Sequence, residues 1–428
     1  MKKPLLILVA GFYSLFSFAQ KIDKVINAAE VQRIEKILSS DSLQGRKTGT
    51  VGIDKAAEFI AAEFAKNKLP FWGNSTSYYQ EFSLVKPKLI TLQGVIDGDT
   101  LKETNFFVNT TQAALHLHGT TGYQIIEIKK EEDFFKKVFA IIDENKNFFV
   151  LVDKVHTDKF KRLKNFGYRA KFASPNNQLF YLTDSKAIGT AHVNAEYQLT
   201  EQKLKNMVAV IPGKSKKDEY VVFSGHYDHL GIGKPNKELD SIYNGANDDA
   251  AGTAAVIMLS NYFTKLKDNE RSLIFVAFTA EEIGGYGSQY FSKQLNPDKV
   301  VAMFNIEMIG TESKWGTNSA YITGYEKSDM GKILQNNLQG SKFKFEPDPY
   351  PTQNLFYRSD NATLAELGVP AHTISTSKMD TEKYYHTVDD EIETLNMENM
   401  AEIIKAIALS SKTIVSGKDT PGRVEKLK

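Results

Sequence analysis

The stretch NGANDDAAGTAAVIML, residues 244–259, sets two adjacent carboxylates directly before a run of small and then aliphatic residues. A helix is predicted to begin near residue 250, and an acidic residue favours a helix start because it can cap free backbone N–H groups. One cap would suffice, however. The second member of the pair Asp248 and Asp249 therefore needs another role, which depends on what neighbouring segments bring to the same place.

Short apolar segments on both sides of this stretch are predicted to be buried strands. YVVFSG (220–225) precedes the helix expected from about 250 to 264, and SLIFVAFT (272–279) follows it. The same alternation continues through predicted strands at 206–213, 299–308, 319–324 and 370–376 and predicted helices at 286–294, 328–338 and 396–414. Short apolar strands separated by helices are typical of a largely parallel sheet covered on both faces. The predicted fold is therefore α/β, with a doubly wound, largely parallel sheet.

The chain outside this alternation suggests a second, smaller domain. Apolar residues at three- and four-residue spacing predict amphipathic helices at 28–41 and 52–68. From about residue 86 the pattern changes to short strands, interrupted by one helical stretch at 130–140. The predicted division is a main domain over 20–85 and 199–415, a β-rich insert over 86–198, and a flexible polar tail over 416–428.

The first residues, MKKPLLILVAGFYSLFSFAQ, have two lysines, an apolar run and a small-residue end. They predict a secretory signal over residues 1–19, cleaved after Ala19, and hence an exported protein, periplasmic or secreted. The apolar run is too short to favour a permanent span, so no stable membrane anchor is expected.

Net charge and cysteine content narrow the chemistry. The net charge of +1 provides no field to attract nucleic acid or acidic membranes, so neither is an expected partner. The chain has 0 cysteines, so any metal site must be built from His, Asp and Glu.

Ionisable side chains gather at the ends of the predicted strands. A doubly wound sheet binds ligands beyond the carboxyl ends of its strands. The side chains expected there are His226, Asp248, Glu281, Glu282 and Glu307, together with Tyr385 and His386 from a late loop. Taken singly, each has a structural explanation, such as a helix cap or a buried histidine. Taken together, so many carboxylates are costly to bury unless a cation neutralises them. We therefore predict a divalent metal.

The nitrogen and oxygen ligands suit zinc, with cobalt or manganese as possible substitutes. Five protein ligands exceed the three expected at one catalytic zinc ion. If one carboxylate bridges, five can serve two ions with three each. Asp248 is short and central, so it is the best candidate for the bridge. Glu281 then remains as a base, and Asp249 remains to cap or brace the turn.

These residues lie in segments that resemble a known family. GHYDHLG (225–231), NGANDDAAG (244–252), TAEEIGGYGS (279–288), FNIEMIG (304–310) and YYHTVDD (384–390) resemble successive signature segments of the M28 family of zinc peptidases, mostly aminopeptidases. The similarity spans about 200–415, and LQGRKTGTVGIDKAAEFIAAEF (43–64) extends it towards the N-terminus.

The resemblance implies two zinc ions per chain and a role for each residue. One ion would take His226, Asp248 and Glu307, and the other Asp248, Glu282 and His386. Glu281 would be the general base and acid, and Tyr385 would polarise the scissile carbonyl. Asp228 and Asp390 would orient the two metal-bound histidines, and the peptide bond after Asp248 would be cis. Glu307 departs from the usual aspartate, which moves the first ion or loosens its grip.

The predicted function is that of a zinc-dependent exopeptidase acting on peptide substrates. It is expected to be an aminopeptidase that releases single N-terminal residues through a metal-bridging hydroxide, with Glu281 as general base. Three alternatives stay open: a glutaminyl cyclase on the same fold, a carboxypeptidase or dipeptidase, and a noncatalytic binding module. A carboxypeptidase would need a cationic pocket, for which Arg358 is a candidate, although Arg358 is equally suited to pair with Asp360. The oligomeric state is left open.

The six remaining histidines considered are expected to be structural or solvated, away from the site: His116, His118, His156, His192, His229 and His372.

Overall fold

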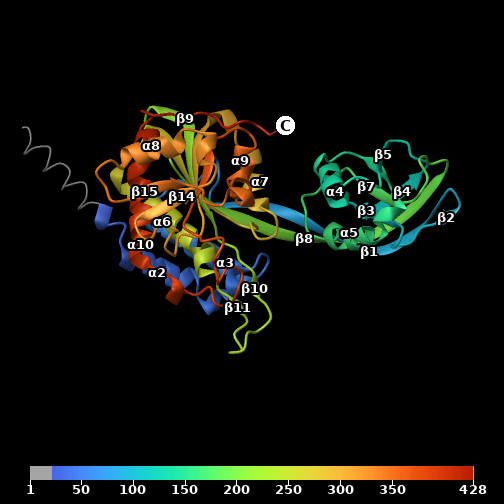
Figure 1. Ribbon diagram of the computed structural model, residues 1–428, viewed down its shortest axis with the longest axis horizontal. Coiled ribbons are helices and arrows are strands. Elements are labelled where there is room, and N and C mark those ends of the chain that lie inside the picture. Colours follow the sequence, from blue (N-terminus) through green and yellow to red (C-terminus); the bar gives the residue numbers. More distant parts are fainter. Residues whose placement is uncertain (1–21, 428) are drawn as a thin grey trace, which may run out of the picture. The chain divides into compact units, whose positions relative to one another are not determined.

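The structure is a computed structural model that describes residues 22–427 (Figure 1). The predicted signal over 1–19 lies outside the described residues. Among those described, no helix is long and apolar enough to cross a membrane. The chain divides into two compact units: residues 22–81 together with 204–427, and Phe82–Lys203.

The first unit is built on a large mixed sheet, which confirms the predicted α/β class. Its strands run in the order β15-β14-β16-β13-β9-β12-β8-β1. The central strands β16, β13, β9 and β12 are parallel, whereas β14 and β8 are antiparallel to their central neighbours. The bounds are β1 Tyr79–Ile96, β8 Ala191–Ile211, β9 Lys216–His226, β12 Arg271–Phe278, β13 Val300–Ile306, β14 Ser319–Ile322, β15 Lys344–Pro347 and β16 Ala371–Ser375.

Alternate residues along the central strands enter two different cores because successive strand side chains point to opposite faces. Val221 and Phe223 face one core, and Val222 between them faces the other. Helices α2, α3, α6, α8 and α10 cover the first face, and α7 and α9 cover the second (Figure 1). Their bounds are α2 Ala28–Leu38, α3 Val51–Lys66, α6 Ala251–Leu266, α7 Tyr286–Lys293, α8 Met330–Asn337, α9 Ala362–Ala365 and α10 Met397–Ser410, followed by α11 Lys412–Val415.

The strand order reverses at β9. The chain leaves β9 through α6 to reach β12 on one side, then returns through α7 to β13 on the other side of β9. Parallel strands end at the same edge of a sheet, so the carboxyl ends of β9, β12 and β13 lie together. This is the switch point at which open α/β sheets bind ligands. A small hairpin, β10 Gly231–Ile232 with β11 Ile242–Tyr243, follows β9.

The second unit, Phe82–Lys203, contains a four-stranded sheet in the order β3-β7-β6-β5. Strands β5, β6 and β7 are parallel and are joined by two helices. The prediction of a β-rich insert with one helix missed the second helix, α5, because among its described residues only Phe160 and Leu163 are buried hydrophobic side chains. The bounds are β2 Asp99–Thr100, β3 Phe106–Asn109, β4 Ala114–His118, β5 Gln124–Ile128, α4 Phe134–Asp143, β6 Phe148–Val152, α5 Thr157–Gly167 and β7 Gln178–Leu182.

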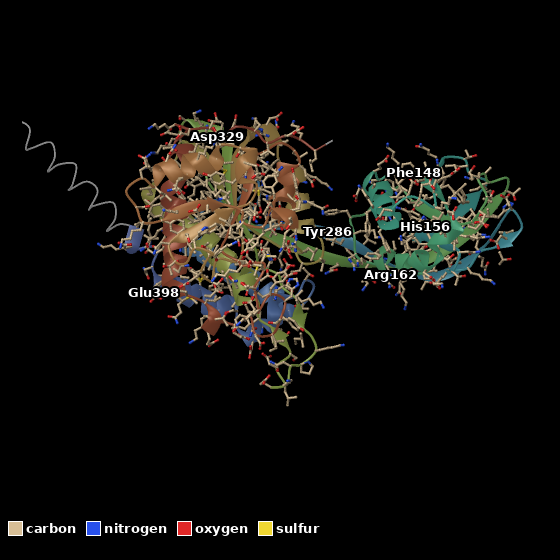
Figure 2. The ribbon with its side chains drawn as sticks, in the orientation of Figure 1. Phe148, His156, Arg162, Tyr286, Asp329 and Glu398 are labelled. Atoms are coloured by element: carbon tan, nitrogen blue, oxygen red, sulfur yellow. The ribbon has the colours of Figure 1, made fainter. Side chains whose placement is uncertain are left out.

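The boundaries predicted for the insert, 86 and 198, fall inside the long strands β1 and β8. A strand pattern that continues through a boundary offers no local break to recognise. Within this unit His156 is buried (Figure 2), and its Nε2 lies 2.9 Å from the carbonyl oxygen of Lys129, a structural contact.

The C-terminal segment is docked on the first unit, so the prediction of a flexible tail is wrong for residues 416–427. Arg271 donates hydrogen bonds to the carbonyl of Asp419, and Arg423 donates to that of Val300. Val424 packs into the second core with only 5% of its surface exposed. The polar composition hid this docking because the acceptors are backbone carbonyls, which every residue carries.

Candidate metal centre

Asp248 lies between two imidazoles at the carboxyl edge of the sheet. Its Oδ1 is 3.2 Å from Nε2 of His226, and its Oδ2 is 3.2 Å from Nε2 of His386. The residue is buried in the short turn η3 (Ala246–Ala250), which leads into α6. One oxygen towards each histidine is the arrangement of a bridging carboxylate.

The first group of donors surrounds His226, the last residue of β9. Its Nε2 is 3.2 Å from Oε1 of Glu307 as well as 3.2 Å from Asp248. Its Nδ1 lies 3.0 Å from the carbonyl oxygen of Asp228, to which it can donate only as Nδ1–H. That tautomer leaves the Nε2 lone pair facing the carboxylates. The donor atoms of His226, Asp248 and Glu307 lie within 4.8 Å of one another, close enough to share one ion.

The second group of donors surrounds Glu282. Its Oε2 is 3.2 Å from Nε2 of His386, and its Oε1 is 2.7 Å from Nδ1 of His229. The donor atoms of His229, Asp248 and Glu282 also lie within 4.8 Å of one another. The expectation that His229 lies beyond the site was wrong. The chain turns back after β9, so a histidine three residues past His226 faces the same carboxylates, and the HYDH spacing was the available signal.

The carboxylates of Asp228 and Asp390, which were expected to orient the histidines, both accept hydrogen bonds from backbone N–H groups, and Oδ1 of Asp228 also lies 3.7 Å from Nδ1 of His226. The Asp228 carboxylate accepts hydrogen bonds from the N–H groups of Glu281 and Glu282 at 3.1 and 3.3 Å. The Asp390 carboxylate accepts from the N–H groups of Asn247 and Asp248 at 2.8 and 3.0 Å. These irregular segments lack ladder partners, so their buried N–H groups need side-chain acceptors.

Asp249 braces the ends of three elements. Its carboxylate accepts from the N–H groups of His226 at 3.1 Å, Gly252 at 3.0 Å and Met308 at 3.1 Å. It therefore joins β9, α6 and the segment after β13, which is the bracing role expected for the second acid of the pair. The peptide bond between Asp248 and Asp249 is cis, as expected.

Glu281 follows β12 and lines the same cavity as Asp248 and Glu307. Burial raises the pKa of its carboxyl well above the usual range, and the nearby carboxylates, Glu307 foremost, add to that rise. A carboxyl with raised proton affinity beside the donor groups is suited to accept and return a proton.

Glu307 is held by a chain of hydrogen bonds that was not predicted. Its Oε2 accepts from Oγ of Ser359 at 2.6 Å, and Ser359 accepts from Nδ2 of Asn305 at 2.7 Å. Asn305 accepts in turn from Oγ of Ser224 at 2.7 Å. The extra methylene of glutamate is therefore restrained at its far end.

A cavity that is open to solvent adjoins the carboxylates. Tyr385 and His386 line it, and their rings stack with centroids 3.9 Å apart. Tyr385 is 39% exposed. Apart from Arg358, the rest of the wall is apolar or hydroxylated: Met308, Tyr321, Thr323, Leu355, Ser359, Thr373, Ser375, Ser377 and Met379.

Arg358 also lines the cavity, and it is the only Lys or Arg to do so among the described residues. Its guanidinium donates to Oε1 of Gln353 at 3.3 Å. The suggested pairing with Asp360 is not formed: Asp360 is buried, and neither of its carboxylate oxygens has a hydrogen-bond partner among the described residues.

The donor set fits a divalent cation. Oδ2 of Asp248 and Nε2 of His229 are buried, yet neither forms a hydrogen bond of normal geometry within the described part of the chain. A buried carboxylate oxygen without a donor is costly unless a cation satisfies it. Carboxylates and imidazoles, without thiols, are ligands that zinc accepts.

Comparison with known proteins shows what this chain is similar to. The model of peptidase family M28 matches residues 206–410. Among curated relatives, aminopeptidase YwaD of Bacillus subtilis is 22% identical over 244 residues, covering 53% of this chain and 48% of the relative. A probable leucine aminopeptidase of Trichophyton verrucosum is 26% identical, covering 49% and 56%. The chain thus spans about half the length of the curated relatives it matches.

Solved structures show the same fold at low identity. The aminopeptidase from Aneurinibacillus sp. strain AM-1 has a TM-score of 0.54 at 17% identity, covering 95% of this chain and 97% of its own. The zinc aminopeptidase BSAP from Bacillus subtilis has a TM-score of 0.52 at 16% identity, covering 94% and 99%.

Proposed function

Since residues 206–410 belong to peptidase family M28, we propose that this chain is a zinc-dependent aminopeptidase that removes single N-terminal residues from peptides. The observation that carries the proposal is the position of Asp248, with one carboxylate oxygen 3.2 Å from each of two histidines. The relatives and solved structures named above are aminopeptidases, which supports the same activity.

Two ions would share Asp248. His226 and Glu307 would complete the first set, and Glu282 and His386 the second. His229 approaches the second set closely, with Nδ1 2.7 Å from Oε1 of Glu282 and 3.9 Å from Oδ2 of Asp248. It would either orient Glu282 or join it as a further ligand.

The reaction would be hydrolysis of the first peptide bond. Zinc ions, when bound, supply Lewis-acid chemistry that acidifies water and polarises a carbonyl. Glu281 would take a proton from the attacking water and return it to the leaving amine, which its raised pKa favours. Tyr385, beside His386 on the cavity wall, would donate a hydrogen bond to the developing oxyanion.

The test uses the protein from Gln20 onward, supplied with zinc. It is incubated with short peptides, each also present as an N-acetylated copy, and products are followed by mass spectrometry. Loss of single residues from free N-termini only is the expected result. Glu281→Gln should abolish it, whereas Glu58→Gln, an exposed helix position, should not.

Other products would identify other functions. Arg358 in the cavity favours one second candidate, a peptidase that recognises a substrate carboxylate, and trimming from the C-terminus would support it. Loss of ammonia or water from N-terminal Gln or Glu would indicate a glutaminyl cyclase. No turnover by protein with measured bound zinc would leave the noncatalytic binding module.

A further inference from the structure

Arg46 is a buried guanidinium outside the proposed catalytic set. It ends the turn η1 (Asp41–Arg46), within the N-terminal segment LQGRKTG, and its side chain has 0% exposure. Its backbone has a φ of 48°, a left-handed conformation that a non-glycine residue adopts at some cost. Neither this residue nor its segment has a role in the proposed reaction.

The guanidinium donates to four backbone carbonyls on three segments. Nε donates to Tyr227 at 2.8 Å, Nη2 to Gly245 at 2.9 Å, and Nη1 to Leu38 at 2.6 Å and Asn244 at 2.5 Å. Tyr227 directly follows the candidate ligand His226, and Gly245 lies three residues before Asp248.

The backbone of Arg46 also contacts His229, a third candidate metal ligand. The N–H of His229 donates to the carbonyl oxygen of Arg46 at 3.3 Å. Arg46 thus contacts both loops from which His226, His229 and Asp248 project.

Only a planar guanidinium suits these acceptors. Buried carbonyls in irregular loops need donors, and four carbonyls spread over three segments cannot all be reached from a single point charge such as a lysine ammonium. There is no space to rearrange, because a Cβ added to Gly245 would lie 2.3 Å from the carbonyl oxygen of Asp248.

The charge on Arg46 also faces the site. The Glu35 carboxylate is fully buried, and Arg46 opposes the burial that raises its pKa. Burial lowers the pKa of Arg46, and the carboxylates of Glu35, Asp390, Asp248 and Asp228 oppose that fall. A fixed cation here lowers the cost of holding carboxylates together before any ion binds.

We propose that Arg46 is a positioning residue that holds the segment directly after His226 and the turn leading to Asp248 at the separation needed to bind metal. The inference rests on the proposed metal site. It assigns the N-terminal segment a role in building that site rather than only in covering the sheet.

The chain contains a matched control in Arg271, the other arginine among the largest fully buried side chains. It also donates to backbone carbonyls, those of Ile414 and Asp419. However, it begins β12, whereas Glu281 and Glu282 follow the opposite end of that strand. Arg46→Lys and Arg271→Lys therefore make comparable changes at and away from the site.

Zinc affinity is measured by competition with a chromophoric chelator, and stability by thermal unfolding of the metal-free proteins. Both variants should lower the unfolding temperature. Arg46→Lys alone should weaken zinc binding, by roughly tenfold or more, as expected for groups that support metal ligands. Ethylguanidinium at non-denaturing concentration should restore the zinc affinity of Arg46→Ala and leave that of Arg271→Ala unchanged.

Equal zinc affinity of Arg46→Lys and the unmodified protein would overturn the inference. Failure of the unmodified protein to bind zinc would instead overturn the proposed function. If the Arg46 variants do not fold, hydrogen–deuterium exchange of the unmodified metal-free protein decides the matter. The backbone amides of residues 226–229 and 244–249 should exchange about as slowly without zinc as with it. Fast exchange in the metal-free protein would contradict the inference that Arg46 holds these segments in place before metal binds.

Discussion

At the scale of single residues, the site depends on how each carboxylate is restrained. Asp248 is short and is placed by its own backbone, whereas Glu307 carries one more methylene and needs a partner at its far end. Ser359 is that partner, at 2.6 Å from Oε2. A longer ligand without such a contact would lose side-chain freedom each time it bound an ion.

The role of Ser359 predicts a specific coupling. Ser359→Ala should weaken one of the two zinc affinities, that of the ion held by Glu307, by about 10- to 100-fold, because a group that holds a ligand is lost. In a Glu307→Asp background the same change should have a smaller effect, since the shorter side chain no longer reaches Ser359. Zinc titrations of both single variants and the double variant measure this coupling. Equal effects in both backgrounds would mean that Ser359 acts elsewhere.

His372 provides a pH prediction away from the metal centre. Burial lowers its pKa to about 4, and its ring nitrogens lie 2.8 Å from the Thr323 carbonyl and 2.7 Å from the Ser328 hydroxyl. The folded pKa lies below the unfolded one, so the stabilisation is complete above pH ~6.5 and is lost as pH falls towards 4. The loss at pH 4 should be about 3 kcal/mol in unfolding free energy.

Two measurements check this prediction. NMR titration of the histidine side chains should find His372 still neutral at pH 5, and His372→Gln should flatten the dependence of the unfolding free energy between pH 7 and 4. The prediction would be contradicted if the His372 imidazole titrated near pH ~6.5 in the folded protein.

At the scale of elements, position 252 in the first turn of α6 is packed too closely to admit a side chain. A Cβ on Gly252 would lie 2.1 Å from the carbonyl oxygen of Ile306 and 2.3 Å from Oδ2 of Asp249. Asp249 is the brace between β9, α6 and the segment after β13. The glycine therefore allows the helix to approach the strand end at which Glu307 projects.

Gly252→Ala should lower the free energy of unfolding by about 1–3 kcal/mol, the usual cost of overpacking, and should also weaken zinc binding by displacing Asp249. Gly340→Ala is the control, because nothing lies within 4 Å of its added Cβ and only its φ of 85° adds strain. Denaturant unfolding and zinc titration of the two variants make the comparison. Unchanged zinc affinity in Gly252→Ala would show that the brace does not influence the metal site.

At the scale of the whole molecule, the chain holds two units with separate apolar cores. The clusters of the first unit contain residues up to 78 and from 207 onwards, and those of the second contain residues 96–197. Every candidate metal ligand belongs to the first unit. Metal binding should therefore stabilise one unit and not the other.

Calorimetry should resolve two unfolding transitions, of which zinc raises only one. At a free zinc concentration 1,000 times the dissociation constant, each bound ion should stabilise the first unit by about 4 kcal/mol. Chelation should reverse the shift, and limited proteolysis after chelation identifies the affected unit. A single transition that shifts as a whole would mean that the two units unfold cooperatively.

Much of the first unit could be predicted because its strands and helices have strong local patterns. The helix expected from about 250 to 264 is observed as Ala251–Leu266, and the strand expected at 272–279 as Arg271–Phe278. Helix α5 and the docked tail were not predicted, because their stability comes from a few buried side chains and from backbone acceptors that carry no sequence signal.

The sequence by itself determined the α/β class and which residue types end the central strands, since apolar periodicity and side-chain chemistry are local properties. Only the tertiary structure decided which of those residues meet. It brought His229 towards Glu282, directed the Asp228 and Asp390 carboxylates to backbone N–H groups, and placed Ser359 on Glu307 and Arg46 on two ligand loops. These contacts join residues from about 50 to 200 positions apart, so their partners are set by how the loops pack and not by any local pattern.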